Sequence, residues 1–237
     1  VGTLRFNGGS VTLSGGGQPT YANALVINSN GTLNSSGGNN NIVSGVWTGT
    51  NTTLSLTISS GGTFTLAGNM TGFYGTVALG NSGGYLRFNG STGSANTIFD
   101  LGTGTSTLNN RNGVSAAIGA LSGGSGTFVN GATSMNNPST YTIGGRNLST
   151  TFNGIITNNN AAQLVNIAKV GTGTLTLNGN NGYLGTTLVN AGKLVINGNQ
   201  SAATGAVTVN TGGTLGGTGT VGGNTIIGGS LAPGTSW

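Results

Sequence analysis

A short phrase, in which a glycine is followed by one residue and then by an apolar residue, recurs along the chain. From Gly173 onward, successive copies begin 19, 21 and 16 residues apart. Repeats of about 20–30 residues are typical of quasi-one-dimensional architectures, in which each repeat stacks only on its neighbours. The phrase therefore predicts a stacked fold. Its copies begin at Gly2, Gly31, Gly62, Gly126, Gly173, Gly192, Gly213 and Gly229.

The segments around these glycines alternate between apolar and small polar residues. Clear cases are Thr53–Ile58, Thr63–Leu66, Thr174–Leu177 and Lys193–Ile196. Such alternation in runs rich in Thr, Val, Ile and Leu predicts β-strands of about four to six residues. Pairs such as Gly-Gly, Asn-Gly and Ser-Gly separate the runs and predict tight turns. No segment has the apolar spacing of an amphipathic helix, so we expect an all-β protein.

Short strands and a repeat together favour a parallel β-solenoid with two or three strands in each coil. Each strand would pair with its equivalent one coil away, with Leu, Val, Ile and Phe inside and Thr, Ser and Asn outside. Glycine would permit the left-handed backbone conformations that the corners require. Asn and Thr outside could form ladders between coils, where like charges would repel one another.

Two other structures remain open at this point. The nine Asn-Gly dipeptides would suit the hairpins of an antiparallel sandwich or barrel, although matched flanking strands are mostly missing. Disorder is disfavoured because 34% of the residues are hydrophobic, which is enough for a thin core, and because the net charge is low.

Composition excludes most kinds of catalysis. Gly, Asn, Thr and Ser fill 143 of the 237 positions, whereas His and Cys are absent and Asp100 is the sole acid. A carboxylate pair for glycoside hydrolysis, a Ser-His-Asp triad and an ordinary zinc site cannot be assembled from these residues. We therefore predict no catalytic, cofactor-binding or metal-binding residues and a protein that is not an enzyme. A Ser–Lys dyad remains open.

The formal net charge of +5 reflects the scarcity of acids. The cations are spread along the chain without a cluster, whereas nucleic-acid binders present a basic stripe. We therefore expect no nucleic-acid partner. No apolar run approaches 18 residues, so no transmembrane segment is expected. The six cations are Arg5, Arg87, Arg111, Arg146, Lys169 and Lys193.

Residues Lys169–Val195 resemble a known family. The stretch begins with a lysine before Gly171-Thr172-Gly173-Thr174-Leu175, continues with Asn181-Gly182-Tyr183-Leu184-Gly185-Thr186-Thr187, and closes with Asn190-Ala191-Gly192-Lys193-Leu194. These features are similar to the autotransporter-associated β-strand repeat. Flanking residues extend the resemblance over Tyr141–Ser236, whereas residues 1–140 match only in style.

The resemblance implies a right-handed parallel β-helix in a bacterial passenger segment that is secreted or displayed on the cell surface. The repeat itself is scaffold in this family, so no catalytic residues carry over. We expect one continuous solenoid over residues 1–237, with irregular coils over 1–140 and repeat-like coils over 141–237. No translocator barrel follows the repeats, so we expect either one piece of a longer passenger or a short stand-alone subunit.

Three weaker patterns have ordinary interpretations. Gly217–Gly222 matches a dinucleotide fingerprint, but no helix follows, and glycine is common enough to produce the match by chance. Asp100 follows Phe99 at an expected turn and would serve as a turn hydrogen-bonder. The phrase around Arg5 returns around Arg87, which suggests two equivalent outward positions or contacts to the carbonyls of a neighbouring subunit.

Six aromatic residues are candidates for stacking on sugar rings, although packing at the core edge is the commoner role of such residues. A carbohydrate-binding face would require them to be exposed. They are Trp47, Tyr74, Tyr85, Tyr141, Tyr183 and Trp237.

Both ends of the chain remain within the repeat pattern and lack the polar caps that usually cover solenoid edges. We therefore expect the coils to continue into covalent neighbours or into other copies of the chain. An open head-to-tail contact would give a filament. The predicted function is a non-enzymatic extracellular structural scaffold that forms a fibre; the alternative is an adhesin passenger segment that binds glycans or a host or biofilm surface. The predicted self-association residues are Val1, Gly2, Thr3, Leu4, Leu231, Pro233 and Trp237.

Overall fold

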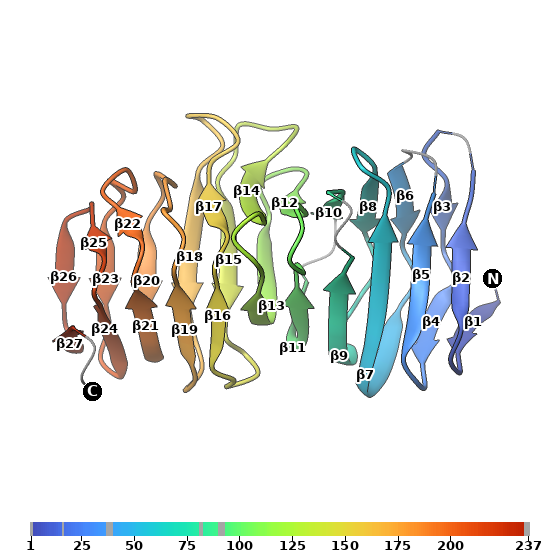
Figure 1. Cartoon of the computed structure of the whole chain (residues 1–237), viewed down its shortest axis with the longest axis horizontal. Helices are drawn as coiled ribbons and strands as arrows, with labels where there is room; N and C mark the ends of the chain where they lie inside the picture. The colour runs from blue at the N-terminus through green and yellow to red at the C-terminus, as the bar shows by residue number, and fades with distance from the viewer. Residues whose placement is uncertain (1, 16, 37–39, 81–82, 90–92, 235–237) are drawn as a thin grey trace.

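The computed structural model describes residues 2–15, 17–36, 40–80, 83–89 and 93–234. The chain is an elongated stack of coils with its two ends far apart and its strands running across the long axis (Figure 1). Among the described strands, all pairings are parallel, and the one antiparallel contact is an isolated bridge between Gly217 and Gly234. These observations confirm the all-β parallel solenoid and exclude the antiparallel sandwich. The described segments contain no helix that is long and apolar enough to cross a membrane.

Strands line three faces of the stack. The first face is a continuous ladder in the largest sheet, in which strands about one coil apart are neighbours. Its strands are β1 (Thr3–Phe6), β4 (Ala24–Ile27), β7 (Trp47–Ile58), β9 (Gly72–Leu79), β11 (Gly93–Asp100), β13 (Ser115–Ser122), β15 (Ser139–Ile143), β18 (Val165–Lys169), β20 (Thr187–Val189), β23 (Val207–Val209) and β26 (Thr225–Ile227).

The second face begins with two strands of the same sheet and continues through the later halves of β7, β9, β11 and β13. A parallel bridge from Gly123 to Phe152 links it to a five-stranded sheet. The strands that belong to this face alone are β2 (Ser10–Leu13), β5 (Gly31–Ser35), β16 (Thr150–Phe152), β19 (Thr174–Leu177), β21 (Gly192–Ile196), β24 (Gly213–Gly217) and β27 (Ser230–Pro233).

The third face consists of a seven-stranded sheet and a two-stranded sheet. Hydrogen bonds connect the two through a segment without strand structure, from Gly182 N to Ile156 O at 3.0 Å and from Asn199 N to Asn180 Oδ1 at 2.8 Å. The strands are β3 (Thr20–Tyr21), β6 (Asn40–Val43), β8 (Thr63–Leu66), β10 (Tyr85–Phe88), β12 (Thr107–Asn110), β14 (Phe128–Ala132), β17 (Ile155–Thr157), β22 (Asn199–Gln200) and β25 (Thr220–Val221).

The alternation of apolar and polar residues predicted where strands lie. It did not predict that one strand can continue around a corner from one face to the next. The runs Thr63–Leu66 and Thr174–Leu177 coincide with β8 and β19. Thr53–Ile58, however, is only the second half of the 12-residue β7. This strand is longer because it turns from the first face, where Trp47 pairs with Leu25, to the second, where Leu54 pairs with Gly31.

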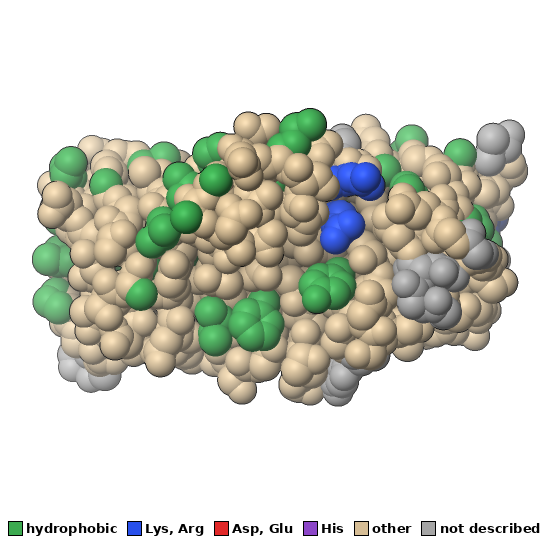
Figure 2. Space-filling view, turned by 90° about the horizontal axis from the view of Figure 1, so that it is seen from above, with side chains coloured by type: hydrophobic (Ala, Val, Ile, Leu, Met, Phe, Trp, Pro, Cys, Tyr) green, Lys and Arg blue, Asp and Glu red, His purple; other side chains and the backbone are tan. Residues whose placement is uncertain are grey.

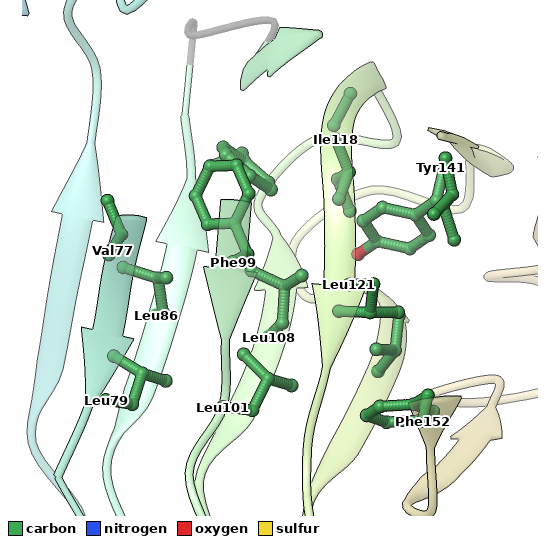
Figure 3. Packing of buried hydrophobic residues seen from close by; sticks show 14 of the residues in the cluster. Val77, Leu79, Leu86, Phe99, Leu101, Leu108, Ile118, Leu121, Tyr141 and Phe152 are labelled. Carbon is green, nitrogen blue, oxygen red and sulfur yellow. The ribbon is translucent and has the colours of Figure 1, made fainter. Parts of the chain in front are cut away.

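Apolar side chains from the three faces fill the interior in columns along the stack. In one column, Leu86 lies beside Leu108, which lies beside Val129, and all three are fully buried. Side chains from opposite faces meet between the sheets (Figure 3), and the rings of Phe88 and Phe99 contact edge-to-face with centroids 5.5 Å apart. The expected inward orientation of Leu, Val, Ile and Phe is thus observed.

Columns of glycine occupy the corners between the second and third faces. A Cβ added to Gly179 would overlap the carbonyl oxygen of Gly154, one added to Gly198 would overlap that of Gly179, and one added to Gly219 would overlap that of Gly198. Neighbouring coils therefore approach closely at these corners, where even a methyl group would not fit. This packing explains glycines that follow strands, including those of the Gly217–Gly222 pattern.

Asparagines form ladders beside these glycines. Asn178 Nδ2 donates to Asn153 Oδ1 at 2.7 Å, and Asn197 Nδ2 donates to Asn178 Oδ1 at 3.0 Å. Each amide thus donates to the coil before it, as expected for stacked identical side chains. Asn-Gly dipeptides here turn the corner of a coil, rather than forming the hairpins considered from the sequence.

Replacing Gly179 with Ala should lower the free energy of unfolding by about 1–3 kcal/mol, because the new methyl group must displace backbone. Gly182→Ala is the matched control, since a Cβ there meets only Ala202 Cβ at 3.8 Å. The control should change stability by less than about 1 kcal/mol. Urea unfolding of both variants measures the difference, and equal stabilities would contradict close backbone contact at the corner.

Candidate assembly ends

The first coil leaves some of its inward side chains partly uncovered, although Phe6 and Leu13 are buried. Leu4 on β1, Val11 on β2 and Tyr21 on β3 point inward but are only half-buried and pack against the core from its open end. One coil further along, Leu25 pairs with Leu4 and is 1% exposed. The first coil differs because no described strand lies on its outer side.

The predicted N-terminal residues have different surroundings. Gly2 and Thr3 are exposed, Leu4 is half-buried, and Val1 lies outside the described residues. Leu4 also lines a small apolar cavity with Tyr21 and Leu25. Leu4 is therefore the predicted residue that belongs to the open end of the core.

The last coil shows the same feature at the opposite end of the stack. Leu231 is 57% exposed although Leu215, its partner one coil earlier, is 3% exposed. Ile227 is 39% exposed, whereas its partner Val209 is buried. Pro233 and Leu231 line an apolar cavity together with Val221. Of the remaining predicted residues at this end, Trp237 lies outside the described residues.

The two ends present one inward apolar residue on each of the same three faces. On the first face these are Leu4 and Ile227, and on the second they are Val11 and Leu231. On the third face they are Tyr21 and Val221. Each terminal strand also has one edge that no described strand covers. A coil placed on either end would therefore meet an apolar surface between free strand edges.

The sequence identified only part of these ends. It named Leu4 on β1 and Leu231 on β27, strands that lie at opposite ends of the stack (Figure 1), but missed Val11, Tyr21, Ile227 and Val221. Alternation within each terminal strand could have identified these inward residues. The sequence does not show, however, which three strands form one coil.

The six aromatic candidates fall into different classes. Trp47, Tyr141 and Tyr183 are buried, so the proposed contact with sugars is wrong for them and the packing interpretation is correct. The buried hydroxyl groups are hydrogen-bonded, as in Tyr141 Oη to Asn130 O at 2.7 Å. Tyr74 and Tyr85 are 45% and 38% exposed, and Trp237 lies outside the described residues.

The cations are less dispersed than their spacing along the chain suggested. Arg87 pairs in register with Asn109, two residues before Arg111, and the proximity of Arg111 is one cause, after burial, of a lowered pKa for Arg87. The expectation that no cations cluster was therefore wrong. Arg5 and Arg87 both point outward, but they lie on different faces, so they are not equivalent positions.

Two charged side chains form hydrogen bonds with backbone groups. Asp100 Oδ1 accepts a hydrogen bond from Gly102 N at 3.1 Å, which confirms its expected role in a turn. Lys169 is 1% exposed, and its Nζ donates to the carbonyl oxygens of Val170 at 2.7 Å, Gly171 at 2.9 Å and Ala191 at 3.2 Å. These three bonds use every ammonium hydrogen, so none is left for a serine hydroxyl group.

Comparison with known proteins places this lysine in a family repeat. Residues 167–196 match the family described as Passenger-associated-transport-repeat. Over 103 residues, the chain is 36% identical to the adhesin BmaC autotransporter of Brucella suis biovar 1 (strain 1330). That match covers 44% of this chain but 3% of the adhesin. No solved structure matches the chain.

The chain therefore contains an autotransporter passenger repeat. This finding confirms the resemblance derived from the sequence. In the structure the matched residues run from β18 through β19, β20 and β21, about one and a half coils, because Ile167 pairs with Thr187. The repeat includes the glycine corner at Gly179 and the buried Lys169, so its characteristic residues build the coil.

Lys169 should make stability depend on pH. Burial lowers the pKa of Lys169 from 10.5 to about 8, so between these values the unfolded chain binds more protons than the folded one. Stability should therefore rise with pH from about 8 to about 10.5. Urea unfolding of wild type and Lys169→Met across this range isolates the contribution as a difference. A difference that stays constant with pH would contradict a depressed pKa.

Proposed function

We propose that this chain is a non-enzymatic scaffold segment of a bacterial cell-surface passenger, with a further coil stacked against each of its ends. The observation that carries the proposal is the shared pattern of the ends, where inward apolar residues lie open on all three faces. In a longer passenger, the covering coils belong to the same polypeptide. For the isolated chain, they belong to other copies, which join head to tail into a fibre.

The physical argument rests on what the ends expose. A parallel strand whose outer edge is bare leaves backbone donors and acceptors available for another strand. Beside these edges, Leu231 and Ile227 expose apolar surface whose burial is favourable. Another coil with the same three-faced cross-section would satisfy both the strand edges and the apolar residues.

Composition supports the non-enzymatic part of the proposal. The chain has no His or Cys and only one carboxylic side chain, so the usual acid–base pairs cannot form within it. Within the matched repeat, Lys169 lies in the core and Gly179 at a corner of the coil. These positions build the coil.

The adhesin match supports a second candidate function, attachment to a glycan or to a host or biofilm surface. It also supports a cell-surface or extracellular location. An adhesive role requires a binding surface on a flank of the solenoid, away from the ends. The exposed Tyr74 and Tyr85 lie on such flanks.

Leu231→Lys should weaken end-to-end association of the isolated chain by about tenfold or more, because it places a charge in an apolar contact. Leu188→Lys is the matched control, since Leu188 is 37% exposed on β20, which is paired with a strand on each side. Analytical ultracentrifugation over a concentration series measures both variants. Electron microscopy of the wild type should show rods that lengthen with concentration.

Two results would contradict head-to-tail stacking. One is a wild-type chain that remains monomeric at concentrations near 1 mM, where even weak contacts of ~4 kcal/mol are populated. The other is equal weakening by Leu231→Lys and Leu188→Lys, which would place the contact on the flanks.

A further inference from the structure

Tyr85 and Arg87 lie side by side on the outer surface of the third face. They are two residues apart on β10, and the inward residues Leu86 and Phe88 are buried between and after them. Because side chains alternate along a strand, Tyr85 and Arg87 point to the same side. Tyr85 is 38% exposed, and its ring therefore forms part of the surface beside the guanidinium.

The next coil brings a second guanidinium to the same place. Arg87 pairs with Asn109 on β12, and Arg111 lies two residues after Asn109, just beyond the end of that strand. Burial and then the charge of Arg111 lower the pKa of Arg87, so the two guanidinium groups lie near each other. The backbone continues the parallel ladder to this point, since Arg111 N donates to Phe88 O at 2.9 Å. Figure 2 shows two basic side chains next to each other on the surface, with hydrophobic side chains nearby.

Most N–H donors of the Arg87 and Arg111 guanidinium groups have no acceptor among the described residues. Arg87 Nε donates to Asn109 Oδ1 at 3.1 Å, which fixes the orientation of its guanidinium. In the described part of the chain, no group accepts a hydrogen bond from the Arg111 guanidinium, and none bonds Tyr85 Oη. The sole acid, Asp100, lies in the sheet of the first face, where it accepts from Gly102 N.

Two adjacent cations without a neighbouring acid repel each other, and an anion placed between them removes this repulsion. Arg146 shows the contrasting arrangement, because its Nη1 already donates to the carbonyl oxygens of Tyr74 at 3.0 Å and Asn96 at 2.9 Å. Arg146 therefore ties coils together, whereas Arg87 and Arg111 remain available to a ligand.

We propose that Tyr85, Arg87 and Arg111 form a binding site for an acidic saccharide on the flank of the solenoid. A sulfate or carboxylate group of the saccharide accepts hydrogen bonds from both guanidinium groups, and its sugar ring packs on the exposed ring of Tyr85. This site is independent of the ends, so it does not depend on the stacking of further coils.

The surroundings favour a saccharide over a nucleic acid. Two arginines can neutralise about two phosphates, whereas nucleic-acid binders present a longer basic stripe. The residues that pair with the site on the next coil are polar, with Thr107 opposite Tyr85 and Asn109 opposite Arg87. The two guanidinium groups can bind one anionic group, while the neighbouring tyrosine ring packs on the sugar ring that carries it.

The test measures binding of three polysaccharides to the whole chain by surface plasmon resonance. Heparin carries sulfates, hyaluronan carries carboxylates alone, and dextran is neutral. Heparin or hyaluronan should bind and dextran should not; which of the two binds more tightly identifies the preferred anion. Arg111→Gln should weaken binding about tenfold, since charge-assisted hydrogen bonds are about twice as strong as neutral ones.

Matched variants separate this site from general charge attraction. Arg5→Gln removes the same charge from an exposed arginine in the related phrase on β1, and it should leave affinity within about twofold. Tyr85→Ala should weaken binding, whereas Tyr74→Ala, which removes the more exposed tyrosine, should not. Because the Arg111 guanidinium bonds no described group, Arg111→Gln should unfold at a temperature equal to or above that of the wild type.

Three results would overturn the proposal. The first is the absence of binding to either acidic polysaccharide at millimolar concentration. The second is an equal loss of affinity in Arg5→Gln and Arg111→Gln, which would show attraction by net charge alone. The third is tighter binding of a single-stranded DNA oligomer than of both polysaccharides, which would assign the site to nucleic acid.

Discussion

The structure depends on the close approach of backbones where one coil turns above another. Parallel strands in register set a spacing of about 4.8 Å between coils, and the corners must keep the same spacing. At the corner through Gly154, Gly179 and Gly198, this spacing leaves no room for a Cβ. Glycine at the corners therefore permits the ladders on all three faces to remain in register, and the ladders align the apolar columns inside.

The same spacing explains the unusual composition. Stacking places equivalent positions of successive coils next to one another, so a charged side chain tends to meet another charged side chain. Asparagine avoids this repulsion because its amide both donates and accepts, as in the ladder of Asn153, Asn178 and Asn197. The buried Lys169 is tolerated because three carbonyl oxygens surround its ammonium group. Scarcity of charge is thus a property of the scaffold, and it leaves few groups for chemistry.

The sequence predicted the local features, such as the positions of strands. It did not predict the contacts between coils, because these depend on the length of each coil. The alternation in Thr63–Leu66 and Thr174–Leu177 predicted strands because the pattern is complete within four residues. Neighbours across coils are separated by a variable distance, 19 residues in one ladder and 26 in another. The proximity of Arg87 and Arg111 was therefore missed, as was the burial of Lys169. The division of the solenoid at residue 140 stays a prediction.

Nuclear Overhauser contacts in the isotopically labelled chain test the parallel register most directly. The structure predicts backbone contacts from Leu175 to Leu194 and from Leu194 to Leu215, each about one coil apart. Contacts should also join the side-chain amides of Asn178 and Asn197. Antiparallel contacts between strands that follow one another in the sequence, across Asn-Gly turns such as Asn178-Gly179, would contradict the stacked coils and every inference drawn from them.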